Sequence, residues 1–409
     1  MNKLSRILQP LCLAGVFAFG AMVPAQAQEL KIGFLAPRTG IFTAIGTDMV
    51  NGFQMYLDEH NGMLGGVKAK FIVEDDQGKP DVDVTKAKKL ILQDKVDMLV
   101  GALLASSAYA LGPVSNEFKT LYIGSSATAD DLAQRQVAKY PYVAFSTWVP
   151  SLPNHPLGQW ACDQGYKKVV AVVADYAFGY EQMGGFQQTF EENGGKILKK
   201  LWPPIVTPDY TPYLAQISDC DGVCQGFAGS NPLRFMKQYA AAGLKYPVVT
   251  GETGGDDALL HSFGDEAIGM HSCCPYTSDL PTDANKRFIS GMEKNFNVLP
   301  GFYAAGLYVN CQVVEAGLKN NGGKSDDKAK LMAALRAVSL TETPRGPIKF
   351  DHFGNVIGDF YVRRLEKANG KLVNKTVKTY HNVSQFWTYD EKKFLAQPVY
   401  SRDFPPIKS

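Results

Sequence analysis

Two loops rich in small hydroxyl residues carry the chemistry that stands out in this sequence. Each follows a short apolar run that predicts a strand: residues 101–108 follow Met98–Val100, and residues 124–129 follow Leu121–Ile123. Hydroxyls and free backbone N–H groups at the start of a helix favour an anion, and a carboxylate fits such a place. Simple capping of each loop's own helix is the alternative. Two such loops on successive strands favour a ligand site.

The common sequence motifs of catalytic sites do not occur in this chain. It contains no GxGxxG after the first predicted strand, no GxxxxGK[ST] loop, no HExxH and no GxSxG. The six histidines are scattered, and no two stand four residues apart on a predicted helix as zinc ligands would. We therefore expect neither an enzyme nor a cofactor nor a metal site.

Six cysteines follow the N-terminal segment. Cys220 and Cys224 could close a small loop, whereas the adjacent Cys273 and Cys274 would each need another partner. An oxidising compartment favours disulfides over thiolate metal sites, and buried free thiols are the alternative. Six cysteines allow 15 pairings, so the connectivity stays open.

The first 27 residues have the pattern of a secretory signal. Lys3 and Arg6 give a positive start, Leu11–Val23 an apolar run, and Ala25–Ala27 a small-residue cleavage site. A membrane anchor is the alternative, but spanning a bilayer takes about 20 apolar residues, and this run is shorter. We expect cleavage after Ala27 and a location in the periplasm.

The net charge of the chain limits the classes of partner that it could bind, and its length predicts the number of lobes. Residues 1–27 hold two of the 42 basic residues and none of the 40 acidic ones, so the remaining chain has 40 of each. A net charge near zero provides no overall electrostatic attraction to nucleic acid or to a membrane surface. The remaining chain also exceeds the ~250–300 residues at which single cores stop growing, which predicts two lobes.

Short apolar or β-branched runs alternate with amphipathic helical stretches, which is typical of an α/β fold with parallel sheets covered by helices. The predicted strands are Lys31–Leu35, Lys70–Val73, Met98–Val100, Leu121–Ile123, Val169–Val173, Val223–Phe227 and Val248–Thr250. The predicted helices include Thr47–His60, Val82–Gln93 and Gly184–Glu192. Two further strands are predicted near the C-terminus, where the chain would complete one of the sheets: Gly346–Asp351 and Asp359–Leu365.

Several short motifs, taken in order, resemble one protein family across residues 28–370. They are Lys31–Gly40, Gly46 with Asn51–Gly52, Glu74–Asp76, Val100–Gly101, Ser125–Thr128 and Gly346–Asp351. Together they are similar to type I periplasmic solute-binding proteins, and within them to the leucine/isoleucine/valine-binding family that feeds ABC importers. The C-terminal tail from Val383 to Asp403 resembles the branch that binds lignin-derived aromatic acids.

The resemblance implies two Rossmann-like lobes that are joined by three crossovers and close on a ligand. We place the crossovers near Ser146, Cys274 and Ile357. Lobe 1 then comprises residues 28–146 and 275–357, and lobe 2 comprises residues 147–274 and 358–409 with the C-terminal extension. The family implies a monomer that delivers a small molecule to the permease subunits of an ABC transporter.

The resemblance also implies a set of site residues. The family's carboxylate-binding groups correspond to Ser106 or Ser107, to the backbone of Ala127, and to the backbone and hydroxyl of Thr128. The apolar walls correspond to Phe42, Ile45, Phe178 and Tyr303. Core packing is the alternative for the last two.

Two departures from the family bear on the ligand. Amino acid binders hold the α-ammonium with a carboxylate where this chain has Thr253, with Glu252 one residue away. A ligand without an amine then fits better, because an unpaired buried ammonium costs several kcal/mol. Ser230 and Asn231 supply polar groups at the far end for a distal hydroxyl, and Arg38 is a further candidate carboxylate partner.

Three hypotheses about the function follow from these residues and from the resemblance. The first is a binding protein for an aromatic monocarboxylate of the benzoate or phenylpropenoate type. The second is a binder of branched-chain or other amino acids, favoured if Glu252 lines the cleft. The third is a sensory protein that docks on a receptor instead of a permease.

Overall fold

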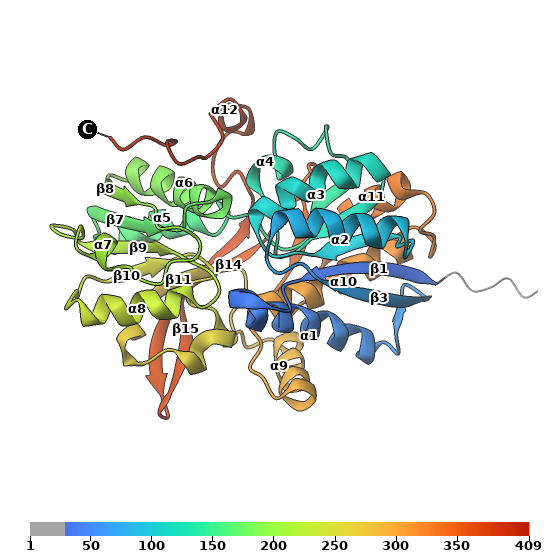
Figure 1. The fold of residues 1–409 in the computed structure, drawn as a ribbon, viewed down its shortest axis with the longest axis horizontal. Coiled ribbons are helices and arrows are strands. Elements are labelled where there is room, and N and C mark those ends of the chain that lie inside the picture. The colour runs from blue at the N-terminus through green and yellow to red at the C-terminus, as the bar shows by residue number, and fades with distance from the viewer. Residues whose placement is uncertain (1–28, 409) are drawn as a thin grey trace, which may run out of the picture.

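Residues 29–408 are described by a computed structural model. The signal peptide and cleavage site expected at residues 1–27 lie outside the described residues. Two lobes lie side by side, each built around its own sheet (Figure 1).

Lobe 1 is built on a six-stranded sheet with the strand order β2-β3-β1-β4-β5-β6. All neighbours are parallel except β2 and β3. Six of the seven residues of β1 are buried, as expected of a parallel strand covered on both faces. The strands are β1 (Leu30–Ala36), β2 (Met63–Leu64), β3 (Val67–Asp75), β4 (Met98–Gly101), β5 (Leu121–Gly124) and β6 (Val143–Phe145). The helices of this lobe are η1 (Gly40–Phe42), α1 (Thr43–Glu59), α2 (Pro80–Leu92), α3 (Ala105–Phe118), α4 (Asp130–Ala133), α9 (Asp283–Phe296), α10 (Phe302–Asn320) and α11 (Lys328–Arg336).

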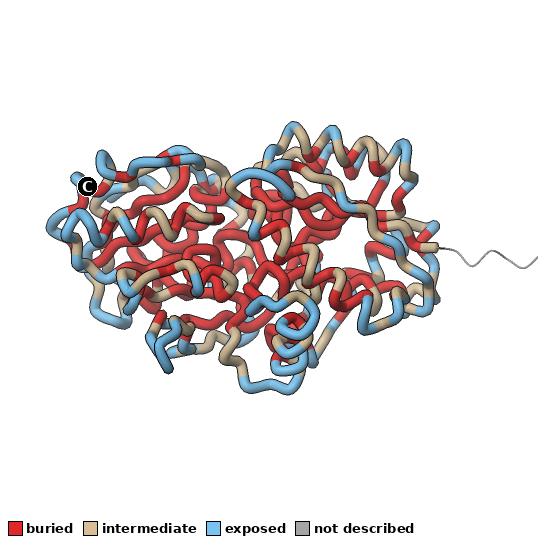
Figure 2. Tube along the Cα trace, turned by 60° about the horizontal axis from the view of Figure 1, so that its bottom comes forward, coloured by how far each residue is buried: buried red, intermediate tan, exposed pale blue. Residues whose placement is uncertain are grey.

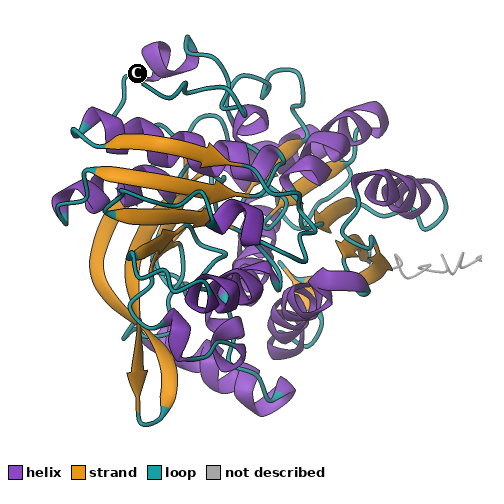
Figure 3. Ribbon diagram, turned by 60° about the vertical axis from the view of Figure 1, so that its left-hand side comes forward, coloured by secondary structure: helices purple, strands orange, loops and turns teal. Residues whose placement is uncertain are grey.

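Lobe 2 is built on a nine-stranded mixed sheet. The strands β8, β7, β9, β10 and β11 are parallel, and β14 joins them antiparallel to β11. Its strands are β7 (Lys168–Val173), β8 (Lys196–Leu201), β9 (Gly222–Gly226), β10 (Val248–Thr250), β11 (His271–Cys274), β12 (Ser339–Leu340), β13 (Ile348–Phe350), β14 (Val356–Ala368) and β15 (Lys371–Val383). Its helices are α5 (Asn154–Asp163), α6 (Ala177–Glu192), α7 (Thr211–Leu214), α8 (Asn231–Ala241), η2 (Asp257–Ser262), η3 (Asp265–Ala267) and α12 (Glu391–Leu395). The long β14–β15 hairpin extends beyond the helices (Figure 3).

The predicted α/β fold with two lobes is confirmed, and every predicted strand overlaps an observed one. Six observed strands were not predicted from the sequence, namely β2, β6, β8, β11, β12 and β15, of which β2 and β12 have two residues each and β15 is largely polar. The exact lobe boundaries stay a prediction. The strands β12 and β13 fall inside the range expected for lobe 1, but they pair with the lobe 2 sheet through β14.

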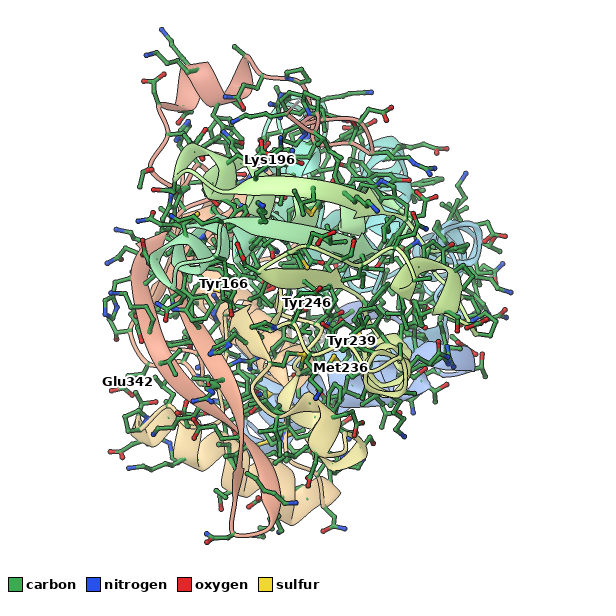
Figure 4. All side chains as sticks on the ribbon, turned by 90° about the vertical axis from the view of Figure 1, so that its left-hand side faces the viewer. Tyr166, Lys196, Met236, Tyr239, Tyr246 and Glu342 are labelled. Atoms are coloured by element: carbon green, nitrogen blue, oxygen red, sulfur yellow. The ribbon has the colours of Figure 1, made fainter. Side chains whose placement is uncertain are left out.

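The buried residues run through the middle of both lobes and across their junction (Figure 2). A second apolar cluster fills the face of the lobe 2 sheet that α8 covers. Met236 and Tyr239 of α8 belong to it, and the Tyr239 hydroxyl donates to the carbonyl of Tyr246 over 2.9 Å (Figure 4). Phe227, which directly follows β9, belongs to the same cluster, so apolar packing supports the loop after this strand.

The C-terminal segment, residues 384–408, contacts both lobes. The Arg135 guanidinium, just after α4 in lobe 1, donates to the carbonyls of Phe394, Leu395 and Gln397 at 2.9–3.2 Å. Tyr400 reaches α5 in lobe 2, where its hydroxyl lies 2.9 Å from Nε2 of His155. The segment therefore passes over the top of the molecule from one lobe to the other (Figure 1).

Candidate functional site

The carboxyl ends of strands from both sheets meet at the junction of the lobes. Loops after β4 and β5 of lobe 1 lie opposite loops after β7, β9 and β10 of lobe 2. Ligands of open α/β sheets bind outside the carboxyl ends of strands. The two hydroxyl-rich loops singled out in the sequence are the lobe 1 side of this junction.

An inner cavity lies between these loops. Both lobes contribute to its wall, which consists of Leu103, Leu104, Ala105, Ser126, Thr128, Trp148, Tyr176, Phe178, Ala228, Thr253 and Tyr303. The cavity has a volume of about 10 Å³, which is room for at most one water molecule. A ligand of several atoms can enter only after the lobes or their side chains move apart.

The lobe 1 wall of the inner cavity is suited to an anion. The Ser126 and Thr128 hydroxyls are buried and have no hydrogen-bond partner among residues 29–408. Helix α3 begins at Ala105, also in the wall, and its N-cap Leu104 makes no side-chain capping bond. A helix N-terminus carries partial positive charge, so the two hydroxyls and this helix start together favour a carboxylate.

Four aromatic side chains form a large part of the remaining wall, namely Trp148, Tyr176, Phe178 and Tyr303. The Trp148 and Phe178 ring centroids lie 6.2 Å apart at 81°, and those of Tyr176 and Phe178 lie 5.6 Å apart. Trp148 is held in place because its indole N–H donates to the carbonyl of Ser125 over 2.9 Å. Edge-to-face rings of this kind offer favourable contacts to a further flat ring.

The loop after β10 places Glu252 and Thr253 differently. Thr253 lines the cavity, and its hydroxyl donates to the carbonyl of Phe227 over 2.5 Å. Glu252 is fully buried and does not line the cavity. Burial raises the pKa of Glu252 well above its usual range, which favours the neutral carboxyl group over the carboxylate. A neutral carboxyl is a poor partner for an ammonium group.

The predicted site residues divide into groups. Thr128, Phe178, Thr253 and Tyr303 line the inner cavity, whereas Ile45 and Ser230 line a second cavity farther out between the lobes. The Phe42 ring lies against Gly229 of lobe 2, where a Cβ would come within 2.8 Å of it. The roles of all these residues stay predictions.

The remaining predicted residues lie outside the inner cavity wall. Ser106 is half-buried, and Ser107 lies next to the Asp83 carboxyl group. The Ala127 N–H donates to the carbonyl of Ala102 over 3.1 Å, so it is already engaged. Two further predicted residues already form hydrogen bonds with the backbone. The Arg38 guanidinium donates to the carbonyl of Gly46 over 3.3 Å, and the Asn231 side-chain amide donates to the carbonyl of Ile205 over 2.7 Å.

Sequence reasoning missed Trp148 and Tyr176. Trp148 follows β6, a strand that was not predicted from the sequence. Tyr176 stands three residues after the predicted strand that ends at Val173, so the rule that loops after parallel strands hold ligands could have found it.

The second cavity, which we call the outer chamber, has a volume of about 610 Å³ and lies between α1, α8 and η2. Ile45 and Leu233 give it apolar walls, and Asp48 and Asp256 are also among its lining residues. Burial raises the pKa of both carboxyl groups, with added repulsion from Asp256 at Asp48 and from Asp257 at Asp256, where the pKa rises to about 7. Both carboxyl groups already accept backbone N–H groups, those of Ala304 and Phe302, and no lysine or arginine is among the described lining residues, so the chamber offers a carboxylate ligand no cation although it is the larger of the two cavities.

Neither metal nor disulfide chemistry appears among residues 29–408. No group of three or more potential ligands there could hold a metal ion. The six cysteines of this range are free thiols, and Cys220 and Cys224 are not bonded to each other. The same range contains no helix with the length and apolarity needed to cross a membrane.

Comparisons with known proteins agree with this architecture. A family model described as "Periplasmic binding protein" matches residues 29–371. The "Leu/Ile/Val-binding protein homolog 6" of Brucella suis is 28% identical over 385 residues, covering 90% of this chain and 96% of that protein.

Solved structures of solute-binding proteins of ABC transporters are also similar. One from Rhodopseudomonas palustris BisB5, in complex with 3,4-dihydroxybenzoic acid, is 30% identical, has a TM-score of 0.82, and covers 87% of this chain and 98% of its own. Two from R. palustris, in complex with benzoate and with 4-hydroxybenzoate, are 28% and 25% identical, with TM-scores of 0.81 and 0.82. They cover 87% and 88% of this chain, and 98% and 99% of their own. The resemblance inferred from the sequence is thereby confirmed: this chain belongs to the family of type I periplasmic binding proteins, which are solute-binding proteins of ABC transporters.

Proposed function

We propose that this protein captures a small aromatic monocarboxylate, of the benzoate or phenylpropenoate type, in the inner cavity and delivers it to an ABC permease. The observation that carries the proposal is the pairing of two buried, unpartnered hydroxyls, Ser126 and Thr128, with the rings of Trp148, Phe178 and Tyr303. The hydroxyls and the start of α3 hold the carboxylate, and the rings enclose the aromatic body.

Binding is coupled to the movement of the lobes. A cavity of about 10 Å³ cannot admit an aromatic acid, since drug-sized ligands occupy pockets of roughly 300–1,000 Å³. The ligand therefore enters an open arrangement, and the lobes close on it. Closure then presents both lobes to the permease as one surface, and the equilibrium shifts by as much as the ligand prefers the closed form.

An amino acid is the second candidate because the curated relatives are named Leu/Ile/Val-binding proteins. An α-ammonium would need a charged carboxylate at Glu252. That group is buried behind the cavity wall, and its burial favours the neutral form. The three similar structures that hold benzoate or hydroxybenzoates also favour the aromatic acid.

Export to the periplasm and action as a monomer belong to the same proposal. They rest on the signal-like residues 1–27 and on the family.

A thermal-shift screen tests the ligand class. A ligand that binds only the native state raises the Tm, by an amount that grows with its concentration relative to Kd. We expect benzoate, 4-hydroxybenzoate or a phenylpropenoate to raise the Tm of the chain that begins at Gln28, and leucine to leave it unchanged. Stabilisation by amino acids alone would contradict the proposal.

A further inference from the structure

Five buried polar side chains of lobe 2 gather behind the cavity wall. They come from α5, α6, β9, β10 and the loop after β10, and each is at most 1% exposed. We call them the polar pit, which consists of Asn154, Gln182, Gln225, Thr250 and Glu252.

Three glycines allow these side chains to lie against the backbone. A Cβ on Gly251 would lie 2.5 Å from Nε2 of Gln182 and 3.0 Å from the Asn154 amide. A Cβ on Gly226 would lie 2.7 Å from Oε1 of the same glutamine. A Cβ on Gly254 would lie 2.1 Å from Oγ1 of Thr250 and 2.2 Å from Nε2 of Gln225. The pit is therefore one continuous cluster around residues 250–254.

The cluster contains polar atoms that the fold does not use. Seven atoms find no hydrogen-bond partner within residues 29–408: Asn154 Oδ1, Gln182 Oε1 and Nε2, Gln225 Oε1, Thr250 Oγ1, and Glu252 Oε1 and Oε2. The Asn154 amide lies close enough to favour the charged form of Glu252, but without the geometry of a hydrogen bond. Each buried unsatisfied group costs about 1–3 kcal/mol, so seven in one place indicate that the cluster serves an incoming polar group.

The polar pit adjoins the inner cavity. Glu252 is the chain neighbour of Thr253, a wall residue. Its carboxyl group is also close enough to raise the pKa of two ring hydroxyls in the wall, those of Tyr176 and Tyr303. A ring held by its carboxylate in lobe 1 would direct its opposite edge toward lobe 2.

The chemistry of the pit suits a neutral hydroxyl. Gln182 offers both a donor and an acceptor, Asn154 and Gln225 offer acceptors, and Thr250 can act as either. A second carboxylate would meet the nearby acceptors, and an ammonium would lack a charged partner, because burial favours the neutral form of Glu252. A phenolic hydroxyl both donates and accepts, so it can satisfy two or more of the unused atoms.

We propose that the polar pit binds ring hydroxyl groups, so that the ligands of this protein are hydroxylated aromatic acids in preference to unsubstituted ones. This inference rests on the proposed function. It differs from the sequence expectation, which directed the distal hydroxyl toward Ser230 and Asn231. Of these, Ser230 lines the outer chamber, and the Asn231 amide is already bonded to a backbone carbonyl.

The test is isothermal titration of benzoate and of 4-hydroxybenzoate against the wild-type chain and three variants. Gln182→Met and Thr250→Val remove polar atoms of the pit at nearly constant volume. Gln187→Met is the matched control, because Gln187 is a buried glutamine on the same helix whose amide donates to Pro406 of the C-terminal segment. Thermal melts show that each variant is folded, and Thr250→Val, the smaller change, keeps the test decisive if Gln182→Met does not fold.

We expect wild-type protein to bind 4-hydroxybenzoate about tenfold or more tightly than benzoate. Either pit variant should lose most of the preference for 4-hydroxybenzoate, while its affinity for benzoate changes less than about threefold. The control variant Gln187→Met should keep the preference for 4-hydroxybenzoate. Equal affinity for the two acids in wild type, or equal losses for both in the pit variants, would overturn the pit's role and leave the proposed function standing. Failure of both acids to bind wild type would refute the proposed function, and the pit's role with it.

Discussion

A hydrogen bond between the lobes offers a way to change ligand affinity without touching the ligand. The Tyr109 hydroxyl on α3 of lobe 1 donates to Oε1 of Glu181 on α6 of lobe 2 over 2.5 Å. The other oxygen of Glu181 accepts from the Asp130 N–H over 3.2 Å. Glu181 is 1% exposed, so these bonds form only when the lobes are together. We predict that Tyr109→Phe weakens the closed form.

The size of the effect follows from what the substitution leaves behind. In the closed form, Oε1 of Glu181 loses its donor while buried, which costs about 1–3 kcal/mol. In the open form, water replaces the lost partner. Since about 1.4 kcal/mol is a factor of ten, the closed–open ratio falls by roughly 5- to 150-fold. The apparent Kd for benzoate rises by up to that factor if the free variant is mostly open.

Titration calorimetry with benzoate measures the change in Kd, and small-angle scattering of the free protein measures the shift toward a longer, open shape. Tyr180→Phe is the matched control. It removes a hydroxyl on α6 that donates to Asp175 over 2.6 Å within lobe 2. An unchanged Kd in Tyr109→Phe, or an equal change in Tyr180→Phe, would refute the reasoning that Glu181 holds the lobes together.

Two further predictions concern stability. Burial raises the pKa of Asp83 to about 8 and that of Asp76 to about 6, and repulsion from Asp76 adds to the shift at Asp83. The folded state thus binds these protons more tightly than the unfolded chain, and their stabilisation is complete below about pH 4 and lost as the pH rises through 6–8. Thermal melts should show Asp83→Asn losing less Tm than wild type between pH 5 and 9; parallel curves would contradict this. Arg363→Leu leaves Asp257, its fully buried partner at 2.7 Å, without a counter-ion, and urea unfolding should show a loss of about 3–5 kcal/mol. Adding Asp257→Asn should recover part of the loss, and no recovery would argue against the ion pair as the cause.

The sequence predicted the fold well because its signals are local. Parallel strands buried on both faces, such as β1, β4 and β7, read as continuous apolar runs. Strand β6 is as short as β10, which was predicted, but it has one β-branched residue where β10 has three, so its sequence favours a strand less. Strand β15 is mostly exposed or half-buried, and its polar side chains hide it from an apolar pattern.

The candidate site was less predictable because it depends on pairing in space. Thr128 and Phe178 follow recognisable strands, and the structure places both in the inner cavity wall. Asn231 looked available as a polar group for the ligand, but its amide is bonded to a carbonyl 26 residues earlier in the chain. Glu252 looked like an ammonium partner, and only the fold shows that it is buried behind Thr253. Such engagement by distant backbone leaves no local pattern.

We propose that Ser126 and Thr128 hold the carboxylate of an aromatic acid. This proposal is tested most directly by isothermal titration of benzoate against wild type and Thr128→Val, with leucine as the comparison ligand. We predict one-site binding of benzoate to wild type, no heat with leucine, and a rise in Kd of about tenfold or more in the variant, because a hydrogen bond to a charged group is worth about 1.5–3 kcal/mol. Tight binding of leucine, or an unchanged Kd for benzoate in Thr128→Val, would contradict the account.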